Sequence, residues 1–260
     1  MNLLELTNSL IPSVIKAGKI IMGIYQGEIT KKIKTDGSPV TEADNAAEKI
    51  ILRELNRLAP EILVISEESP ESHSKVSKGK FFLVDPLDGT KEFLKRDGKG
   101  SFTVNIGLID NHKPVMGIVY APALERLFFG VQNFGAWEVF NGVKTKISIG
   151  KLKTKSVVAV ASVSHRDKQT DAWLKKNKIS EITSIGSSLK FCLVATGQAD
   201  VYPRFGPTME WDTAAGDAIL RAAGGKVTNP DLSNFNYGKS FYRNGPFIAW
   251  GSYNGRADIK

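Results

Sequence analysis

The sequence predicts an α+β fold made of two halves that meet near residue 145. The first half opens with two helical patterns and continues with short apolar segments, too closely spaced to leave room for helices between them. Such strands favour an antiparallel sheet. After about Lys144 strands and helices alternate. We therefore expect one half in residues 1–145 and a second half in residues 146–260.

Two helices are predicted at the start of the chain. The first ends near Gly27 and has apolar residues at helical spacing, namely Leu6, Leu10, Val14, Ala17 and Ile21. The second begins at Thr41, because Thr41 and Asp44 have the spacing of a capping box, with Asp in place of Glu. Pro60 ends this helix. Asp44 is therefore expected in its first turn.

The remaining elements follow from short apolar runs and turn residues. In the first half we expect the strands Ile62–Ser66, Phe81–Val84, Thr103–Ile109, Val115–Tyr120, Arg126–Val131 and Trp137–Phe140. Asp110–Pro114 and Asn141-Gly142 are hairpin turn signals. In the second half we expect the strands Val157–Val163, Ile182–Ile185, Asp200–Tyr202 and Phe247–Trp250. Between them we expect the helices Asp167–Asn177, Ser188–Thr196 and Asp212–Ala223.

The composition is typical of a soluble globular protein. Hydrophobic residues make up 42% and charged residues 24% of the 260 residues. No apolar stretch is long enough to span a bilayer, and the start does not resemble a secretory signal. The single cysteine, Cys192, excludes an internal disulfide and is typical of a reducing compartment. We expect a cytoplasmic protein, and the sequence leaves peripheral attachment to the inner face of the inner membrane open.

The net charge of +8 comes from lysines dispersed along the chain. No arginine-rich stripe or aromatic stacking array accompanies them, so a nucleic-acid partner is not expected. Dispersed positive charge suits the steering of a small phosphorylated molecule. The sequence leaves the oligomeric state open.

Two aspartates follow the apolar strand at Phe81–Val84. The strand delivers Asp85, Pro86 is expected to stop the ladder, and Gly89 permits a sharp turn. Asp88 can then converge with Asp85 and the carbonyl of the intervening leucine on one point, an all-oxygen environment that suits Mg²⁺. The alternative interpretation is that Asp85 and Asp88 belong to a solvent-exposed turn. Aspartyl-phosphate enzymes use Asp-x-Asp, whereas residues separated by two others cannot share a strand face, so the spacing favours metal ligands over a nucleophile.

Two further acidic elements occupy similar positions. Glu67-Glu68 follows the strand Ile62–Ser66, and Asp212 opens a predicted helix. A polar loop and a helix N-cap are the alternative interpretations. If Glu67, Asp85, Asp88 and Asp212 converge, each pair about 4 Å apart repels by roughly 4 kcal/mol at an effective dielectric constant near 20. Such a cluster stays ionised only when cations neutralise it.

These segments resemble the signatures of the inositol monophosphatase superfamily. The segments Asp85-Pro-Leu-Asp-Gly-Thr-Lys-Glu-Phe93 and Trp211-Asp-Thr-Ala-Ala-Gly216 are similar to its two motifs, and Glu67-Glu68 and Lys34–Asp44 precede them in the family's order. The segments Gly186–Phe191 and Tyr202–Asp212 resemble its 3'(2'),5'-bisphosphate nucleotidase branch. The resemblance implies a layered α/β/α/β/α sandwich of the inositol monophosphatase and fructose-1,6-bisphosphatase type.

The resemblance also implies two or three Mg²⁺ ions and in-line attack by water without a phosphoenzyme. Glu67, Asp85 and the Leu87 carbonyl would hold one ion. Asp85, Asp88 and Asp212 would hold a second, and a third would lie near Glu67. Asp44 and Thr90 match the pair that orients and deprotonates water, beside the catalytic Glu67.

Substrate contacts are implied for a wider set, namely Asp88, Gly89, Thr90, Lys91, Ser164, His165, Gly186, Lys190 and Asp212. The branch usually has an arginine where this chain has Val163, and His165 could instead be a surface-loop histidine. The implied reaction converts 3'-phosphoadenosine 5'-phosphate into AMP and phosphate, a step of sulfate assimilation, and the enzyme would be lithium-sensitive. An inositol or sugar monophosphatase with the same metal centre, or a binding protein that retains the fold without turnover, are the alternatives.

Overall fold

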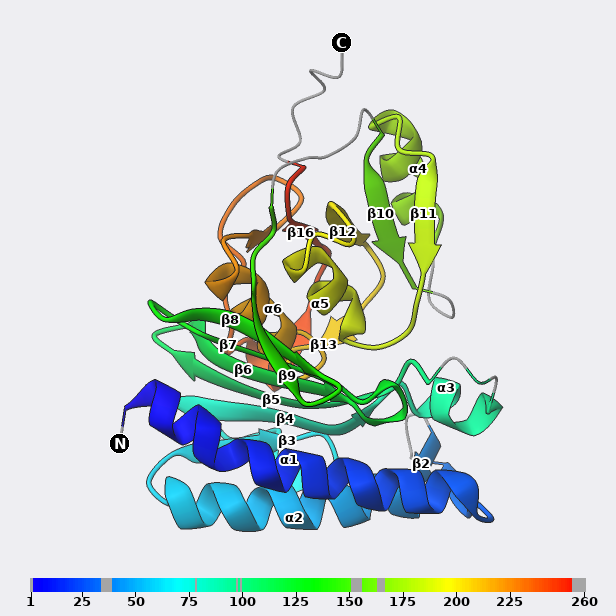
Figure 1. Cartoon of the computed structure of the whole chain (residues 1–260). Coiled ribbons are helices and arrows are strands. Elements are labelled where there is room, and N and C mark those ends of the chain that lie inside the picture. Colours follow the sequence, from blue (N-terminus) through cyan, green and yellow to red (C-terminus); the bar gives the residue numbers. More distant parts are fainter. Residues whose placement is uncertain are drawn as a thin grey trace.

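Helices and sheets alternate in five layers in the computed structural model (Figure 1), which describes residues 2–33, 39–77, 79–96, 98, 100–150, 156–162 and 167–253. Helices α1 (Leu3–Gln26) and α2 (Glu42–Leu58) form the first layer and cover one face of a seven-stranded sheet. Helices α5 (Leu189–Ala195) and α6 (Ala214–Ala222) lie between this sheet and a five-stranded sheet, and α4 (Lys168–Lys176) lies outside the second sheet. The α/β/α/β/α sandwich is therefore confirmed.

The seven-stranded sheet has the order β3-β4-β5-β6-β7-β8-β9. Its strands are β3 (Leu63–Ser66), β4 (Phe81–Asp88), β5 (Thr103–Asp110), β6 (Lys113–Ala121), β7 (Arg126–Val131), β8 (Gly135–Phe140) and β9 (Val143–Ile147). All neighbours in it are antiparallel except β3 and β4, which are parallel. The expectation of a purely antiparallel sheet is wrong at this one edge, because a longer connection with the 3-10 turn Pro70–Ser72 returns the chain to the same end.

The five-stranded sheet has the order β11-β10-β12-β16-β14. Its strands are β10 (Val158–Ala161), β11 (Glu181–Ser184), β12 (Val201–Arg204), β14 (Lys226–Thr228) and β16 (Phe247–Trp250). The smaller elements are the ribbons β1 (Lys31–Ile33) with β2 (Pro39–Thr41) and β13 (Thr208–Met209) with β15 (Arg243–Asn244), and the short helix α3 (Thr90–Lys95).

Side chains that alternate along the strands divide the interior into separate cores. In β4, Phe82 and Val84 pack with the α1–α2 layer, while Phe81 and Leu83 pack with the α5–α6 layer. The second sheet follows the same rule, and its outer face packs on α4 through residues such as Leu174. Strands buried on both faces read as continuous apolar runs, because neither face meets water.

The predicted start of the second helix is confirmed, and the first helix also begins with a capping box, which was not predicted. Thr41 caps α2: its side chain accepts a hydrogen bond from the Ala43 amide, and Asp44 accepts one from the Thr41 amide at 2.8 Å. Asn2 and Glu5 form a second capping box at the start of α1. These bonds satisfy amides that the first helical turn leaves without partners.

Helix α6 lies directly on the backbone of the seven-stranded sheet. Gly107, Gly117 and Gly130 are register partners in β5, β6 and β7 and form a row beneath it, here called the glycine row. A Cβ atom at Gly117 would lie 2.1 Å from the Ala215 carbonyl oxygen, and one at Gly130 would lie 2.6 Å from the Ile219 Cα. Only glycine allows so close an approach.

Several predicted boundaries need correction. Residue 145 falls inside β9, so the first sheet ends slightly later than the predicted boundary, and the division into two domains stays a prediction. Helix α6 begins at Ala214 rather than Asp212. Strand β10 ends at Ala161, and Val163 lies outside the described residues. The ribbons and α3 had no periodic signal and were not expected.

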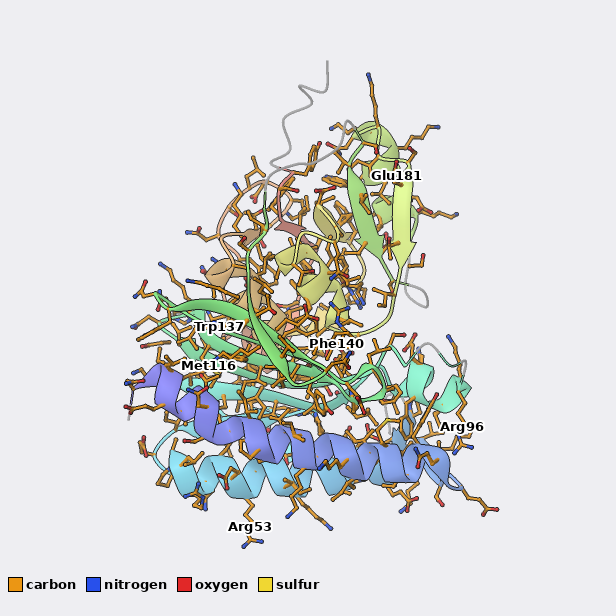
Figure 2. The ribbon with its side chains drawn as sticks, viewed as in Figure 1. Arg53, Arg96, Met116, Trp137, Phe140 and Glu181 are labelled. Atoms are coloured by element: carbon orange, nitrogen blue, oxygen red, sulfur yellow. The ribbon has the colours of Figure 1, made fainter. Side chains whose placement is uncertain are left out.

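Figure 2 shows how side chains fill the spaces between the layers. Met116 is buried within the sheet, whereas Arg53 on α2 points away from the body. Among the helices of the described ranges, none combines the length and apolar character that crossing a bilayer requires.

Candidate metal centre and active site

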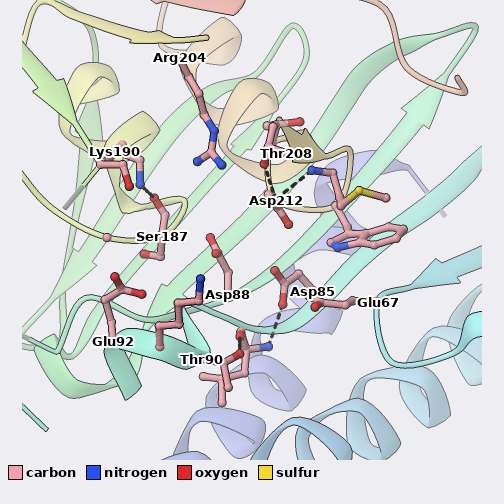
Figure 3. A pocket seen from close by; sticks show the side chains of 18 of the residues that line it. Glu67, Asp85, Asp88, Thr90, Glu92, Ser187, Lys190, Arg204, Thr208 and Asp212 are labelled. Carbon is pink, nitrogen blue, oxygen red and sulfur yellow. Dashed lines mark hydrogen bonds between the residues drawn. The ribbon is translucent and has the colours of Figure 1, made fainter. Parts of the chain in front are cut away.

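A cavity of about 290 Å³ opens where the ends of β3 and β4 meet the layer of α5 and α6 (Figure 3). Glu67, Asp85 and Asp88 lie on one side of the cavity, and Lys190 and Arg204 lie across from them on the side here called the cationic wall. Asp212 lies between Arg204 and Asp85 and completes the carboxylates, here called the carboxylate wall. The sequence-predicted residues on its lining are Glu67, Asp85, Leu87, Asp88, Gly89, Thr90, Lys91, Gly186, Lys190 and Asp212. Ser164 and His165 lie outside the described residues.

Three carboxylates from distant parts of the chain converge in the cavity. Glu67 follows β3, Asp85 lies in β4 and Asp212 lies just before α6. One oxygen of each lies within 4.8 Å of an oxygen of the other two. Glu67 lies in a turn and lines the cavity, and Asp212 does not fit the alternative interpretation of a helix cap. The cap residue of α6 is Thr213, while Asp212 accepts hydrogen bonds from the Met209 amide at 3.0 Å and the Thr208 hydroxyl.

A bulge in β4 brings Asp88 to the same cavity as Asp85. The register pairs Asp85 with Asn105 and Asp88 with Thr103, so β4 contains one residue more than β5 over this stretch. In a regular strand the two aspartates would point to opposite faces, and an extra residue reverses that relation. The expectations that Pro86 ends the ladder and that the two aspartates cannot share one side are therefore wrong. Both side chains line the cavity (Figure 3).

The carboxylates are electrostatically strained in the absence of a cation. Burial raises the pKa of Asp85 well above its usual range, and the charges of Glu67, Asp88 and Asp212 raise it further. Burial and the charge of Asp212 raise the pKa of Asp88 to about 6, although Lys190 and the hydrogen bonds from Ser188 oppose this. These shifts have the sign expected of carboxylates gathered out of water.

The donor set fits a hard divalent cation. Asp85 is 1% exposed, and its Oδ2 finds no hydrogen-bond partner among the described residues. Its Oδ1 accepts a hydrogen bond from the Leu87 amide at 3.0 Å. Buried carboxylate oxygens almost always have a partner, so an oxygen without one inside an acidic cluster is suited to bind a cation. An all-oxygen set of this kind suits Mg²⁺.

Thr90 and Asp44 lie together beside this cluster. The Thr90 hydroxyl is 3.3 Å from Asp44 Oδ1 and 3.2 Å from the Leu87 carbonyl oxygen, so it can donate to either. Asp44 Oδ2 accepts hydrogen bonds from the Thr41 amide and hydroxyl at 2.8 and 2.6 Å. Gly89 makes the turn before Thr90 with φ +90°, a left-handed conformation that glycine adopts without strain. The capping box therefore fixes the carboxylate that Thr90 contacts.

Ser188 links Asp88 to the second half of the chain. Its amide and hydroxyl lie 2.5 and 2.8 Å from Asp88 Oδ2. The same hydroxyl lies 2.6 Å from the Asp212 carbonyl oxygen and accepts a hydrogen bond from Asn105 at 2.9 Å. Ser188 was expected only as the start of a helix, because nothing in the local pattern shows where its side chain points.

The cationic wall contains one predicted residue and one that was missed. Lys190 is 3% exposed, and its ammonium donates to the Ser187 carbonyl at 2.6 Å. Arg204, at the end of β12, donates from Nη2 to the Pro207 carbonyl at 2.8 Å. Its Nε has no partner within the part of the chain that the structure describes. Its place at the end of a short apolar strand did not indicate where its side chain points.

Known proteins share both the sequence and the fold of this chain. Residues 2–253 match the profile of the inositol monophosphatase family. The chain is similar to the 3'(2'),5'-bisphosphate nucleotidase CysQ of Salmonella typhimurium, with 49% identity over 214 residues, 81% of this chain and 85% of that protein. The protein of the same name from Escherichia coli K12 is 47% identical over the same lengths. The crystal structure of CysQ from Bacteroides thetaiotaomicron superposes with a TM-score of 0.81 at 37% identity, over 95% of this chain and 97% of that one. The chain belongs to the inositol monophosphatase family.

Proposed function

We propose that this protein is a Mg²⁺-dependent 3'(2'),5'-bisphosphate nucleotidase that converts 3'-phosphoadenosine 5'-phosphate into AMP and phosphate. The observation that carries the proposal is the cavity of about 290 Å³ itself, which is lined by a carboxylate cluster, by the buried Lys190 and by the half-buried Arg204. The two relatives named 3'(2'),5'-bisphosphate nucleotidase CysQ support the same reaction. It would serve sulfate assimilation, and the single cysteine supports the cytoplasm as its place of action.

The carboxylate wall would hold two or three Mg²⁺ ions. Glu67, Asp85 and the Leu87 carbonyl are proposed to bind one ion. Asp85, Asp88 and Asp212 are proposed to bind a second, and a third would lie near Glu67. Bound Mg²⁺ supplies Lewis-acid stabilisation of phosphoryl oxygens and lowers the pKa of water. The orphaned Asp85 Oδ2 and the mutual repulsion of the carboxylates support this assignment.

The chain's own residues would manage the proton of the attacking water. The Thr90 hydroxyl can donate to Asp44 Oδ1, which leaves its oxygen lone pairs to accept a hydrogen bond from water. As water attacks, its proton would move to Thr90 and the Thr90 proton to Asp44 Oδ1. The two bonds from Thr41 hold Asp44 in place during this transfer. General-base assistance of this kind typically contributes 10²–10⁴-fold to the rate.

The cationic wall favours a substrate with a second phosphate. Lys190 donates to the Ser187 carbonyl and Arg204 to the Pro207 carbonyl, and the Arg204 Nε has no partner among the described residues. An arginine fork matches phosphate oxygens in geometry and charge. We therefore assign the second phosphate to Arg204, with Lys190 adding positive charge. Lys91, Gly89 and Gly186 line the same space, and contacts by Ser164 and His165 stay predictions.

The test is hydrolysis of a panel of phosphate esters in Mg²⁺. We expect release of phosphate and AMP from 3'-phosphoadenosine 5'-phosphate at a kcat/KM well above that for inositol 1-phosphate or a sugar monophosphate. A preference for inositol 1-phosphate would favour the alternative substrate class. Absence of turnover on the whole panel would contradict a phosphatase.

A further inference from the structure

Glu67 lies in a β-turn whose two ends are held by one buried carboxylate. The turn spans Ser66–Ser69 and is closed by a hydrogen bond from the Ser69 amide to the Ser66 carbonyl at 3.1 Å. Glu67 and Glu68 are its two central residues. The Glu67 amide also donates to the Val84 carbonyl of β4 at 3.1 Å. The position of this turn therefore determines where the Glu67 carboxylate enters the cavity.

The buried carboxylate belongs to Glu48 of α2. Glu48 Oε1 accepts hydrogen bonds from the Ser66 hydroxyl at 2.5 Å and the Ser69 hydroxyl at 2.9 Å. Glu48 is 9% exposed. Bonds from hydroxyls to a carboxylate are charge-assisted and shorter than neutral ones. A single oxygen thus holds both ends of the turn.

Glu48 lies one helical turn after Asp44, on the same face of α2. Asp44 contacts Thr90 beyond the end of β4, and Glu48 contacts the turn beyond the end of β3. One rigid helix therefore fixes two separate parts of the site relative to each other. Glu48 itself does not line the cavity.

The turn needs such a restraint because its ligand is repelled by its neighbours. The oxygens of Glu67, Asp85 and Asp212 lie within 4.8 Å of one another, and like charges at this separation push the turn outward until a cation binds. A turn held against that repulsion presents Glu67 at the distance that a cation requires. Outer partners that orient metal ligands typically change metal affinity 10- to 100-fold when removed.

We propose that Glu48 is a positioning residue that pre-forms the metal centre by holding the Ser66–Ser69 turn. The proposal rests on the metal centre proposed above and goes beyond it, because Glu48 does not line the cavity. If Glu48 served only to attach α2 to β3, its loss would change stability and leave the affinity for metal unchanged.

The experiment measures binding of Mg²⁺ alone by calorimetry, and of Mn²⁺ by electron paramagnetic resonance, without substrate. Glu48→Ala is expected to weaken metal binding about 10- to 100-fold. Glu48→Gln keeps an acceptor oxygen for both hydroxyls and should retain most of the affinity. The matched control is Glu54→Ala on the same helix, where the carboxylate accepts hydrogen bonds from Arg57 at 3.1 and 2.7 Å, and wild-type affinity is expected.

Activity provides a second readout. Saturating Mg²⁺ should restore most of the kcat of Glu48→Ala, because the ligands themselves are intact. Wild-type metal affinity in Glu48→Ala would overturn the proposal. So would a loss of metal affinity in Glu54→Ala or in Glu48→Gln as large as that in Glu48→Ala. If Glu48→Ala does not fold, Ser69→Ala removes one of the two bonds and must still weaken metal binding. If the wild-type protein binds no metal, the proposed function fails rather than the role of Glu48.

Discussion

Asp88→Asn should make the metal-free protein more stable while it removes activity. Burial and the charge of Asp212 raise the pKa of Asp88 to about 6, against an ordinary value near 3.9 in the unfolded chain. A carboxyl whose pKa is raised by folding destabilises the folded state when the pH is above the unfolded value. This destabilisation is absent below about pH 4, grows as the pH rises, and is complete above the folded pKa near 6.

The difference of about two pH units corresponds to about 3 kcal/mol at 1.36 kcal/mol per unit. Asparagine resembles the protonated carboxyl, so the substitution should recover up to this amount at pH 8, which raises the melting temperature by about 6–12 °C. The gain should shrink steadily toward pH 4.

Thermal unfolding in EDTA at pH 4.5, 6 and 8 measures this effect, and the same proteins in Mg²⁺ measure turnover. In saturating Mg²⁺ the wild-type protein should have the higher melting temperature, because its ligand set binds the ion more tightly. The turnover of Asp88→Asn should be lower than that of the wild type by orders of magnitude. Asp231→Asn is the matched control, since it removes the same charge at a position outside the cavity where the carboxylate accepts local hydrogen bonds from Ser233. A stability gain that does not depend on pH, or near-native turnover, would refute the reasoning.

Three further outcomes are expected. Thr90→Ala should lower kcat by about 100-fold or more with little change in KM, because only the proton path to Asp44 is lost. Thr90→Ser keeps the hydroxyl and should restore activity. Equal activity of the two variants in steady-state kinetics would contradict the role of Thr90 in proton transfer. Arg204→Ala should lower kcat/KM for the bisphosphate nucleotide by about ten- to a hundredfold, because losing a charge-assisted hydrogen bond costs about 1.5–3 kcal/mol, and it should affect a simple monophosphate much less. Lys190→Ala should show the same selectivity to a smaller degree. Equal losses on both substrates would indicate that these cations support the fold rather than bind the second phosphate. Millimolar Li⁺ should inhibit hydrolysis by occupying a Mg²⁺ position with one charge too few, and unchanged rates in a Li⁺ titration would exclude that expectation.

The elements that could be predicted are those with a periodic signal. The apolar spacing of α1 and α2, the capping box at Thr41 and the run of hairpins each depend on local sequence, and the structure confirms them. That Glu67 and Asp85 lie close together could be anticipated from local pattern, because each follows a short apolar run. Their roles as metal ligands stay predictions.

The rest depends on pairing between distant segments. The bulge between Asp85 and Asp88 is defined by the register with β5, and that register has no signature within β4 itself. The ribbon of β13 and β15 has only two residues in each strand, too few for any period. Arg204 could not be assigned from the sequence because the direction of its side chain follows from the packing of β12 on β16.

The glycine row limits how the protein can move. Enzymes that enclose their substrates by closing two domains need an interface across which side chains can slide or a hinge can open. Here the backbone of α6 lies against the backbone of three strands, and no side chain at the glycine row can repack to allow such a shift. Asp212, just before α6, should therefore keep its distance from Asp85 throughout turnover. We expect substrate to enter and leave through local movements at the rim of the cavity, with the two layers behaving as one rigid frame.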